Sequence, residues 1–299
     1  LQAIEIKPNI AQVHANIGFV FYQKLVELDD VLDGSNTQND NSGFHGKVSD
    51  SLKVTSYLEK VIQYYQQALE INPVYSADVC NNLGVAYAKM KRFEEAIQQY
   101  NKAIGIDAQY DEAYGNLGQA LHEQKRLEEA ISAYQKAIDI GSECTEYHRG
   151  YGDSLLLTGN WKQGWKEYEW RWKNDKFLAR NERIFPHLTW DGSSLDNTSI
   201  LVWLEQGVGD QIMFASLLPK LQQQAEETFV EIEYRLYPIF RRSFHNIRFL
   251  IARTQPHPQL LDESIGYQSP IGSLAQWLLP DQESFPKYHA YLKACQKKT

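Results

Sequence analysis

Hydrophobic and polar positions repeat with a period of 34 residues through the N-terminal half of the chain. Each unit has a bulky residue followed by glycine, then a small residue, then an aromatic residue. The matching positions are Leu83-Gly84, Leu117-Gly118 and Tyr151-Gly152, then Ala96, Ala130 and Gly164, then Tyr100, Tyr134 and Tyr168. A repeated unit that cannot bury its apolar face alone predicts a stack of antiparallel helix pairs. The glycine and the small residue are expected where two helices cross closely, with the aromatic ring between neighbouring units.

The spacing resembles that of the tetratricopeptide (TPR) repeat, a helix-pair module. We therefore expect residues 1–173 to form a TPR α-solenoid that binds a protein or peptide. Residues 1–8 match the end of a repeat's second helix, so the chain is expected to begin inside a repeat, as a fragment or processed form. The first full repeat holds 31 more residues between Gly18 and Ala68 than a later repeat holds, which predicts a polar insertion loop at about 27–57.

An asparagine precedes the bulky residue and glycine in three repeats, at Asn16, Asn82 and Asn116. Stacked repeats would place these side chains as a ladder on the concave surface. An amide both donates and accepts hydrogen bonds, so such a ladder can hold the backbone of an extended peptide. The pattern resembles a similar ladder in the O-linked N-acetylglucosamine transferases, which also carry TPR repeats. The three asparagines therefore predict a peptide-binding groove, and the alternative is that they only satisfy local contacts.

The last repeat departs from the pattern, because Arg171 takes the place of an alanine and four tryptophans crowd its second half. Trp165, Tyr168 and Trp172 share one helical face. A stripe this bulky predicts a cap that docks onto a different domain. A ligand-stacking role for the tryptophans is the alternative.

The character of the chain changes after residue 173. Residues 174–197 are predicted to be a linker. Short apolar runs of buried-strand type then alternate with helical patterns: strands at 199–204, 228–234 and 247–252, helices at 211–223 and 237–246, and a helical stretch at 272–279. This alternation predicts a parallel sheet with helices on its faces, a Rossmann-like α/β domain over 198–299.

Composition narrows the classes of function. The net charge of −8 makes a broad footprint for nucleic acid unexpected. The three cysteines are scattered, and no ligand spacing for a metal is found, so we expect reduced thiols, no metal site and a cytoplasmic location. No apolar run approaches the length of a membrane span.

The segment from Glu205 to Asp210, EQGVGD, follows the first predicted strand of the α/β domain. Ligands of such folds bind outside the carboxyl ends of the strands. Gly207 and Gly209 permit close approach of a ligand, and the helix that follows offers free N–H groups. An N-cap role for Asp210 is the alternative that the residues alone favour.

Three motifs together resemble bacterial TPR proteins that are fused to a glycosyltransferase-like module. They are GNWKQGWKEYEWRW (159–172), WDG (190–192) and ILVWLEQGVGDQIMF (200–214). The module is similar to the heptosyltransferase-type enzymes of the GT-B fold and, more distantly, to the TPR O-linked N-acetylglucosamine transferases. The resemblance implies that Asp210 is the catalytic base that deprotonates the acceptor hydroxyl. It also implies that Glu205, Gln206, Gly207 and Gly209 shape the acceptor pocket.

A GT-B enzyme has two Rossmann-like halves, and residues 198–299 provide room for one. The resemblance therefore implies the acceptor-side half of a sugar-transferring enzyme that recruits a protein or glycan acceptor. A nucleotide-sugar donor is expected only if a second domain exists, and no cofactor is expected to bind this chain. The alternative is a non-catalytic TPR scaffold for protein–protein interaction.

Overall fold

The computed structural model describes residues 10–35, 43–74, 76–141, 143–181, 183–205, 207–287 and 290–294. The chain forms two compact units, residues 1–154 and 155–299. The predicted repeat end at residues 1–8 lies outside the described residues.

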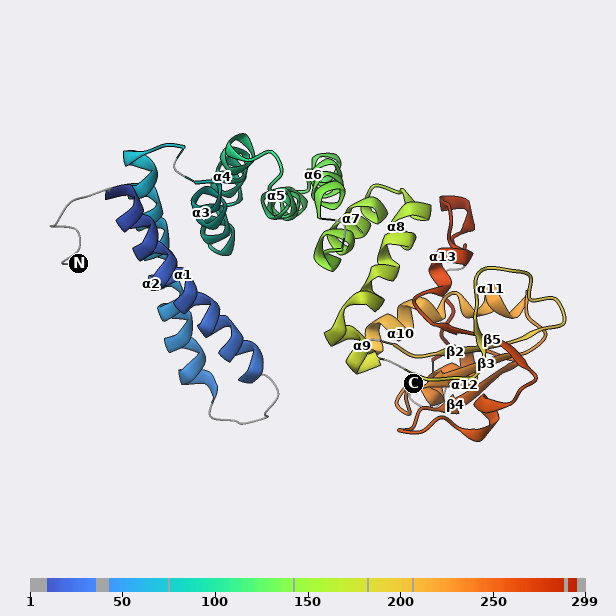
Figure 1. Ribbon diagram of the computed structural model, residues 1–299. Helices are drawn as coiled ribbons and strands as arrows, with labels where there is room; N and C mark the ends of the chain where they lie inside the picture. The colour runs from blue at the N-terminus through green and yellow to red at the C-terminus, as the bar shows by residue number, and fades with distance from the viewer. Residues whose placement is uncertain are drawn as a thin grey trace. The chain divides into compact units, whose positions relative to one another are not determined.

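The first unit consists of helices that pack as antiparallel pairs (Figure 1). They are α1 (Ile10–Ser35), α2 (Gly43–Ile71), α3 (Ala77–Lys89), α4 (Phe93–Ile106), α5 (Asp111–Glu123), α6 (Leu127–Ile140) and α7 (Thr145–Leu157). This order confirms the predicted helical solenoid.

The repeat glycines Gly18, Gly84 and Gly118 each lie against the ring of a tyrosine. A Cβ atom on Gly84 would lie 2.5 Å from the Tyr100 ring, and one on Gly118 would lie 2.9 Å from the Tyr134 ring. Tyr134 also contacts Gly150 of the following helix. The close crossing of two helices is therefore the reason for the glycine, as the repeat pattern predicts.

The predicted insertion loop is wrong for most of its length. Helix α1 continues to Ser35 and α2 begins at Gly43, so the extra residues lengthen both helices of the first pair. Residues 36–42 lie outside the described part of the chain. Two facing helices can extend together because each supplies the other with a surface to pack on.

The second unit is an α/β unit. Its helices are α8 (Trp161–Tyr168), η2 (Glu169–Lys173), α9 (Asp175–Asn181), α10 (Val208–Ala215), α11 (Leu218–Gln222), α12 (Tyr237–Ser243), η3 (Pro258–Leu261), α13 (Leu274–Leu278) and η4 (Gln282–Ser284). Its strands are β1 (Leu188–Thr189), β2 (Ser199–Trp203), β3 (Thr228–Ile232), β4 (Ile247–Ile251) and β5 (Ile265–Pro270). The strands form one sheet in the order β1-β5-β2-β3-β4, and all its pairs are parallel.

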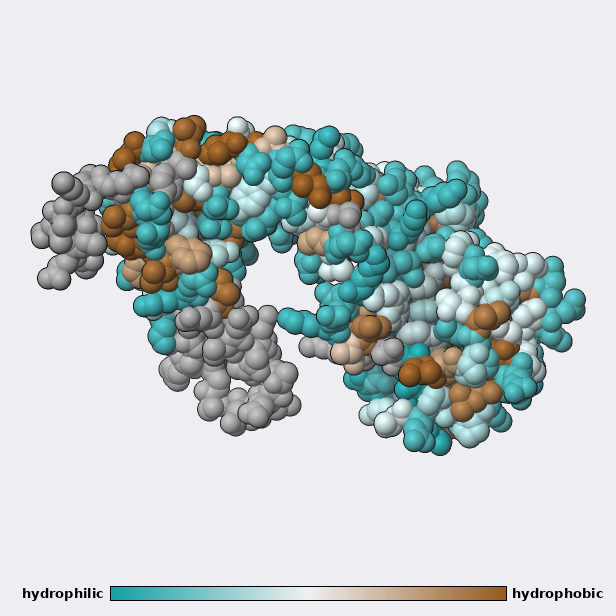
Figure 2. Space-filling model, viewed as in Figure 1, coloured by the Kyte–Doolittle hydropathy of each residue, from teal (hydrophilic) through white to brown (hydrophobic). Residues whose placement is uncertain are grey.

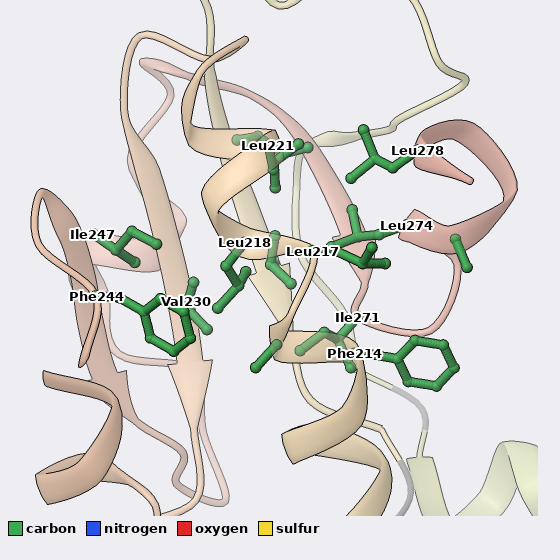
Figure 3. Packing of buried hydrophobic residues seen from close by; sticks show 14 of the residues in the cluster. Phe214, Leu217, Leu218, Leu221, Val230, Phe244, Ile247, Ile271, Leu274 and Leu278 are labelled. Carbon is green, nitrogen blue, oxygen red and sulfur yellow. The ribbon is translucent and has the colours of Figure 1, made fainter. Parts of the chain in front are cut away.

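The two faces of the sheet are covered differently. On one face, α10, α11, α12 and α13 pack on β2 and β3 around Phe214, Leu218, Phe240 and Leu274 (Figure 3). On the other face, a smaller cluster joins Leu201, Trp203 and Phe229 to η3 and to Trp172 of η2. Helices therefore cover one face, whereas short segments cover the other.

The tryptophan-rich segment packs on this α/β core, which is the docking that its bulky stripe predicts. Trp165 and Tyr168 lie 6.3 and 6.2 Å from the Phe214 ring, whereas Trp172 lies 5.5 Å from Trp203. Helix α8 ends at Tyr168, and the tighter turn of η2 carries Trp172 to the cluster on the other face of the sheet.

The division between the units falls at 154/155 rather than at 173, and the segment predicted as a linker is structured. Residues 174–197 contain α9 and β1, and β1 pairs with β5.

Exposed apolar side chains of the first unit include Phe19, Val20 and Val26 of α1. Brown, hydrophobic atoms also gather over the first helices in Figure 2, whereas the middle of the array is largely teal. None of the described helices is long and apolar enough to cross a membrane.

Candidate functional site

The first helix of each repeat lines a groove in the first unit. Asn16 and Asn82 border one hollow of about 640 Å³, together with the rings of Tyr22, Tyr65 and Tyr110. The side chains come from α1, α2 and α3 and from the start of α5, because one face of each helix is turned to the same side.

Asn116 borders a second hollow of about 460 Å³, which is lined by α5, α6 and α7. Glu112 lines both hollows, so the two lie next to each other in the first unit. The three predicted asparagines thus lie along a single surface, although their binding role remains a prediction.

Asn81 connects two of these side chains and was not singled out by the sequence pattern. Its amide donates to Glu112 Oε1 at 3.1 Å, and its Oδ1 accepts from Asn116 Nδ2 at 3.0 Å. Asn81 is fully buried. The sequence does distinguish Asn81, because the positions that match it in the neighbouring repeats are Ala15 and Gly115.

The groove carries more acidic than basic side chains. Its lining residues include five carboxylates and one arginine: Asp78, Glu112, Glu123, Glu146, Asp153 and Arg149. Partial burial acts to raise the pKa of Glu146. Hydrogen bonds from the backbone N–H of Glu146 and from Thr145 outweigh burial, so the pKa of Glu146 is lowered. Burial raises the pKa of Asp153, and the charges of Arg149 and His122 oppose that rise. The lining of the two hollows thus has an excess of acidic over basic side chains.

A buried ion pair occupies the carboxyl ends of β2 and β5 in the second unit. Arg171 Nε and Nη2 donate to the two carboxylate oxygens of Glu205, each at 2.9 Å. Glu205 Oε1 also accepts from the backbone N–H of Gly272 at 2.7 Å, and Arg171 Nη2 donates to Ser273 Oγ at 2.8 Å. Burial raises the pKa of Glu205, and the hydrogen bond from Arg171 opposes that rise.

Glu205 was predicted to shape an acceptor pocket, yet both of its carboxylate oxygens bind protein groups. Arg171 was noted in the sequence only as a departure from the repeat. Nothing in the sequence pairs it with Glu205, because the two residues lie on different elements that only the fold brings together.

Asp210 is the third residue of α10 and is half-exposed. The N-cap of α10 is Gly207, so the N-cap role that the residues alone favour for Asp210 is wrong. A Cβ on Gly209 would meet no atom within 4 Å, and one on Gly207 would meet only Asp210 Oδ2 at 3.9 Å. The space beside both glycines is thus open. Gln206 lies outside the described residues.

Comparison with known proteins identifies the repeats. The tetratricopeptide repeat family matches residues 77–110 and 111–144. Protein FlbA of Caulobacter vibrioides is 31% identical over 152 residues, which are 46% of this chain and 25% of FlbA. The chain therefore spans about a quarter of the length of that curated relative.

Solved structures of TPR proteins are among those to which the chain is similar. YrrB, a TPR protein with an unusual peptide-binding site, is 21% identical with a TM-score of 0.38, over 44% of this chain and 66% of YrrB. The second TPR domain of human RPAP3, solved in complex with an HSP70 peptide, is 21% identical with a TM-score of 0.32, over 33% of this chain and 82% of that domain. Residues 77–144 are therefore two tetratricopeptide repeats within a longer run of helix pairs built on the same pattern.

Proposed function

We propose that the repeats bind an extended, positively charged peptide, and that the α/β unit is the acceptor-side half of a glycosyltransferase-type module. The observation that carries the first part is the pair of neighbouring hollows, whose linings combine amide and carboxylate side chains with tyrosine rings. The peptide would be the acceptor, or part of the protein that bears it.

The groove supplies what an extended backbone needs. The half-exposed amide of Asn82 can donate to a peptide carbonyl and accept from a peptide N–H. Tyrosine rings provide apolar contact area with little loss of conformational entropy. These features would bind a peptide backbone without selecting for particular side chains.

The carboxylates add a preference for charge. Asp78 and Glu112 line the first hollow, whose lining includes no lysine or arginine among the described residues. Each exposed pair with a lysine or arginine of the peptide would contribute up to about 1 kcal/mol. Such contacts also raise the rate of association, and salt weakens them.

The first test compares the full chain with an Asn16→Ala/Asn82→Ala/Asn116→Ala variant on a cellulose-bound array of lysine-containing peptides. We expect the variant to lose about tenfold in affinity, which corresponds to about 1.4 kcal/mol, and to keep its helical circular dichroism. Asn101→Ala on the outer helix α4 is the matched control. Equal binding by the triple variant would remove the asparagines from the groove's function.

The strand order supports the second part of the proposal. Four neighbouring strands have the order β4-β3-β2-β5. The chain adds β3 and β4 on one side of β2 and then returns to add β5 on its other side. This is the order of one half of a doubly wound nucleotide-binding sheet, whose ligands bind at the point of reversal. The segment from Glu205 to Asp210 follows β2 at that point.

The open space beside Gly207 and Gly209 supports a role for this turn in binding. Among the described residues, no contact accounts for either glycine, whereas a ligand that approaches the backbone closely would. Asp210 would accept the proton of the acceptor hydroxyl as its oxygen attacks the anomeric carbon. The donor nucleotide sugar would need a further domain.

The second test uses the full-length gene product and a panel of UDP-, GDP- and ADP-sugars, with release of the nucleotide as readout. We expect Asp210→Asn to lower turnover by at least about a hundredfold without changing the fold. Retained turnover would remove Asp210 from the mechanism. Peptide binding without turnover on any donor would favour the scaffold.

A further inference from the structure

Five of the seven tryptophans surround one cavity in the α/β unit. The cavity has a volume of about 720 Å³ and lies at the carboxyl ends of β1, β5 and β2, beside η2. The tryptophans are Trp170, Trp172, Trp190, Trp203 and Trp277. Neither Asp210 nor the glycines of its turn line this cavity, so it is a different place from the proposed catalytic turn.

One wall is built by the turn after β1. Trp190 is buried, and its Nε1 donates to the backbone oxygen of Ser193 at 2.9 Å. Gly192 has a φ of 85°, and a Cβ at that position would overlap the ring of Trp277. The Trp277 indole is thereby seated against the turn, with its ring 6.5 Å from that of Trp190.

The floor of the cavity is a polar ladder on the strands. Trp203 Nε1 donates to Gln268 Oε1, and Gln268 Nε2 donates to Thr189 Oγ1 at 2.9 Å. These side chains join the ends of β2, β5 and β1. They fix the orientation of the Gln268 amide, which lines the cavity.

The opposite wall is η2. Lys173 Nζ lies 3.5 Å above the centre of the Trp170 ring. Glu169 Oε2 accepts from Ser273 Oγ at 2.9 Å, and its Oε1 pairs with Arg171 at 2.6 Å. Arg171 thereby links Glu169 to the buried Glu205.

The five rings differ in how far they are exposed. Trp190 and Trp203 are 4% and 5% exposed and belong to the core, whereas Trp277 is 38% exposed. Trp170 and Trp172 are half-buried. Large aromatic surface that stays open in a concave site, with a few convergent polar groups, is typical of a small-molecule site.

We propose that this cavity binds a neutral saccharide. A pyranose ring presents an apolar face of C–H groups, which the negative face of an indole attracts, and hydroxyls around its edge. The cavity offers amide and carboxylate partners for those hydroxyls through Gln268, Gln276 and Asp191.

Charge argues for a neutral ligand. The lining carries Lys166 and Lys173 against Glu169 and Asp191, so its formal charge is zero. A nucleotide or a sugar phosphate would need an excess of cations or a row of free backbone N–H groups. The inference goes beyond the proposed function, since binding a saccharide here requires no transfer.

The test uses the full chain and saturation-transfer NMR with the methyl glycosides of glucose, galactose, mannose and N-acetylglucosamine, and with cellobiose and lactose. Affinity for any sugar that gives a signal is then measured by calorimetry. We expect at least one of them to bind. Trp277→Ala and Trp170→Ala should each weaken binding by about tenfold, whereas Trp161→Ala, outside the cavity lining, should leave it unchanged. Asp210→Asn should also leave it unchanged.

The proposal is overturned if none of the six sugars gives saturation transfer, or if both tryptophan variants bind as the unaltered chain does. It is equally overturned if adenosine or uridine monophosphate displaces the bound sugar with higher affinity, because the site would then be one for nucleotides. Loss of turnover in the Asp210→Asn variant with saccharide binding retained would separate this site from the catalytic turn.

Discussion

At the residue scale, Gly84 and Gly105 differ in whether a larger residue could take the place of the glycine. Gly84 faces the ring of Tyr100, which is 2% exposed and cannot move away. Gly105, on the outer helix α4, faces open space. The repeat pattern predicts the first contact, because only the repeated glycine keeps its tyrosine partner 16 residues later.

We expect opposite effects from alanine at these two positions. Gly84→Ala should lower the free energy of unfolding by about 1–3 kcal/mol, because its Cβ would overlap the Tyr100 ring. Gly105→Ala should raise it by about 0.5–1 kcal/mol through the loss of unfolded-state entropy. Urea unfolding followed by circular dichroism at the helix band measures both. A destabilising Gly105→Ala, or a neutral Gly84→Ala, would contradict the packing described here.

Arg171 gives a second prediction at this scale. Arg171→Met should cost about 3–5 kcal/mol, because it leaves the Glu205 carboxylate buried without its partner. Arg171→Met/Glu205→Met should recover most of that loss. All seven tryptophans lie in the α/β unit, so urea unfolding followed by tryptophan fluorescence reports this unit alone. A double variant as unstable as the single one would show that the pair does not act as a unit.

At the element scale, the strands that were predicted are those with apolar runs. β2, β3 and β4 are continuous and apolar enough to stand out, whereas β5 (IGYQSP) and the two residues of β1 are not. The reason is physical: Gln268 and Pro270 of β5 face the tryptophan cavity rather than the core. A strand beside a cavity loses the apolar signal by which buried strands are recognised.

The extended α1 and α2 were missed for a related reason. The segment that lengthens them is rich in Asn, Asp, Ser and Gly, which favour loops by propensity. Pairing of two long helices outweighs that preference. In the candidate site, the repeat along the chain predicted Asn16, Asn82 and Asn116. The roles of Asn81, Arg171 and the cavity could not be predicted, because they depend on contacts between elements that are distant in the sequence.

The buried tyrosines of the repeat helices predict how stability depends on pH. Burial raises the pKa of Tyr65 to about 12, and it raises the pKa of Tyr100 and Tyr134 as well. Above about pH 10 the unfolded chain loses these protons while the folded chain keeps them. The free energy of unfolding should therefore fall by about 1.4 kcal/mol per pH unit for each tyrosine, and for Tyr65 until about pH 12.

Urea unfolding at intervals from about pH 8 to about pH 11, followed by circular dichroism, measures this slope. Tyr100→Phe removes one titrating group, so its slope should be shallower by about 1.4 kcal/mol per unit. Identical slopes for the variant and the unaltered chain would mean that Tyr100 ionises equally in both states.

At the scale of the whole molecule, the chain joins two units with different surfaces. The first has a groove lined by amides, tyrosines and an excess of acidic side chains, and the second has a neutral cavity lined by tryptophans. The two surfaces suit different ligands, a peptide backbone and a saccharide ring. Recruitment of a peptide by the repeats is the claim on which the rest of the proposed function depends.

The most direct measurement of that claim uses two short fluorescein-labelled peptides of equal length, one alternating alanine with lysine and the other alternating alanine with glutamate. Fluorescence anisotropy with the full chain, at low and at high salt, measures the affinity for each. We predict that the lysine peptide binds at least about tenfold more tightly, that salt weakens it, and that Glu112→Gln weakens it while Glu128→Gln on the outer helix α6 does not. Equal affinities, or tighter binding of the glutamate peptide, would contradict the account.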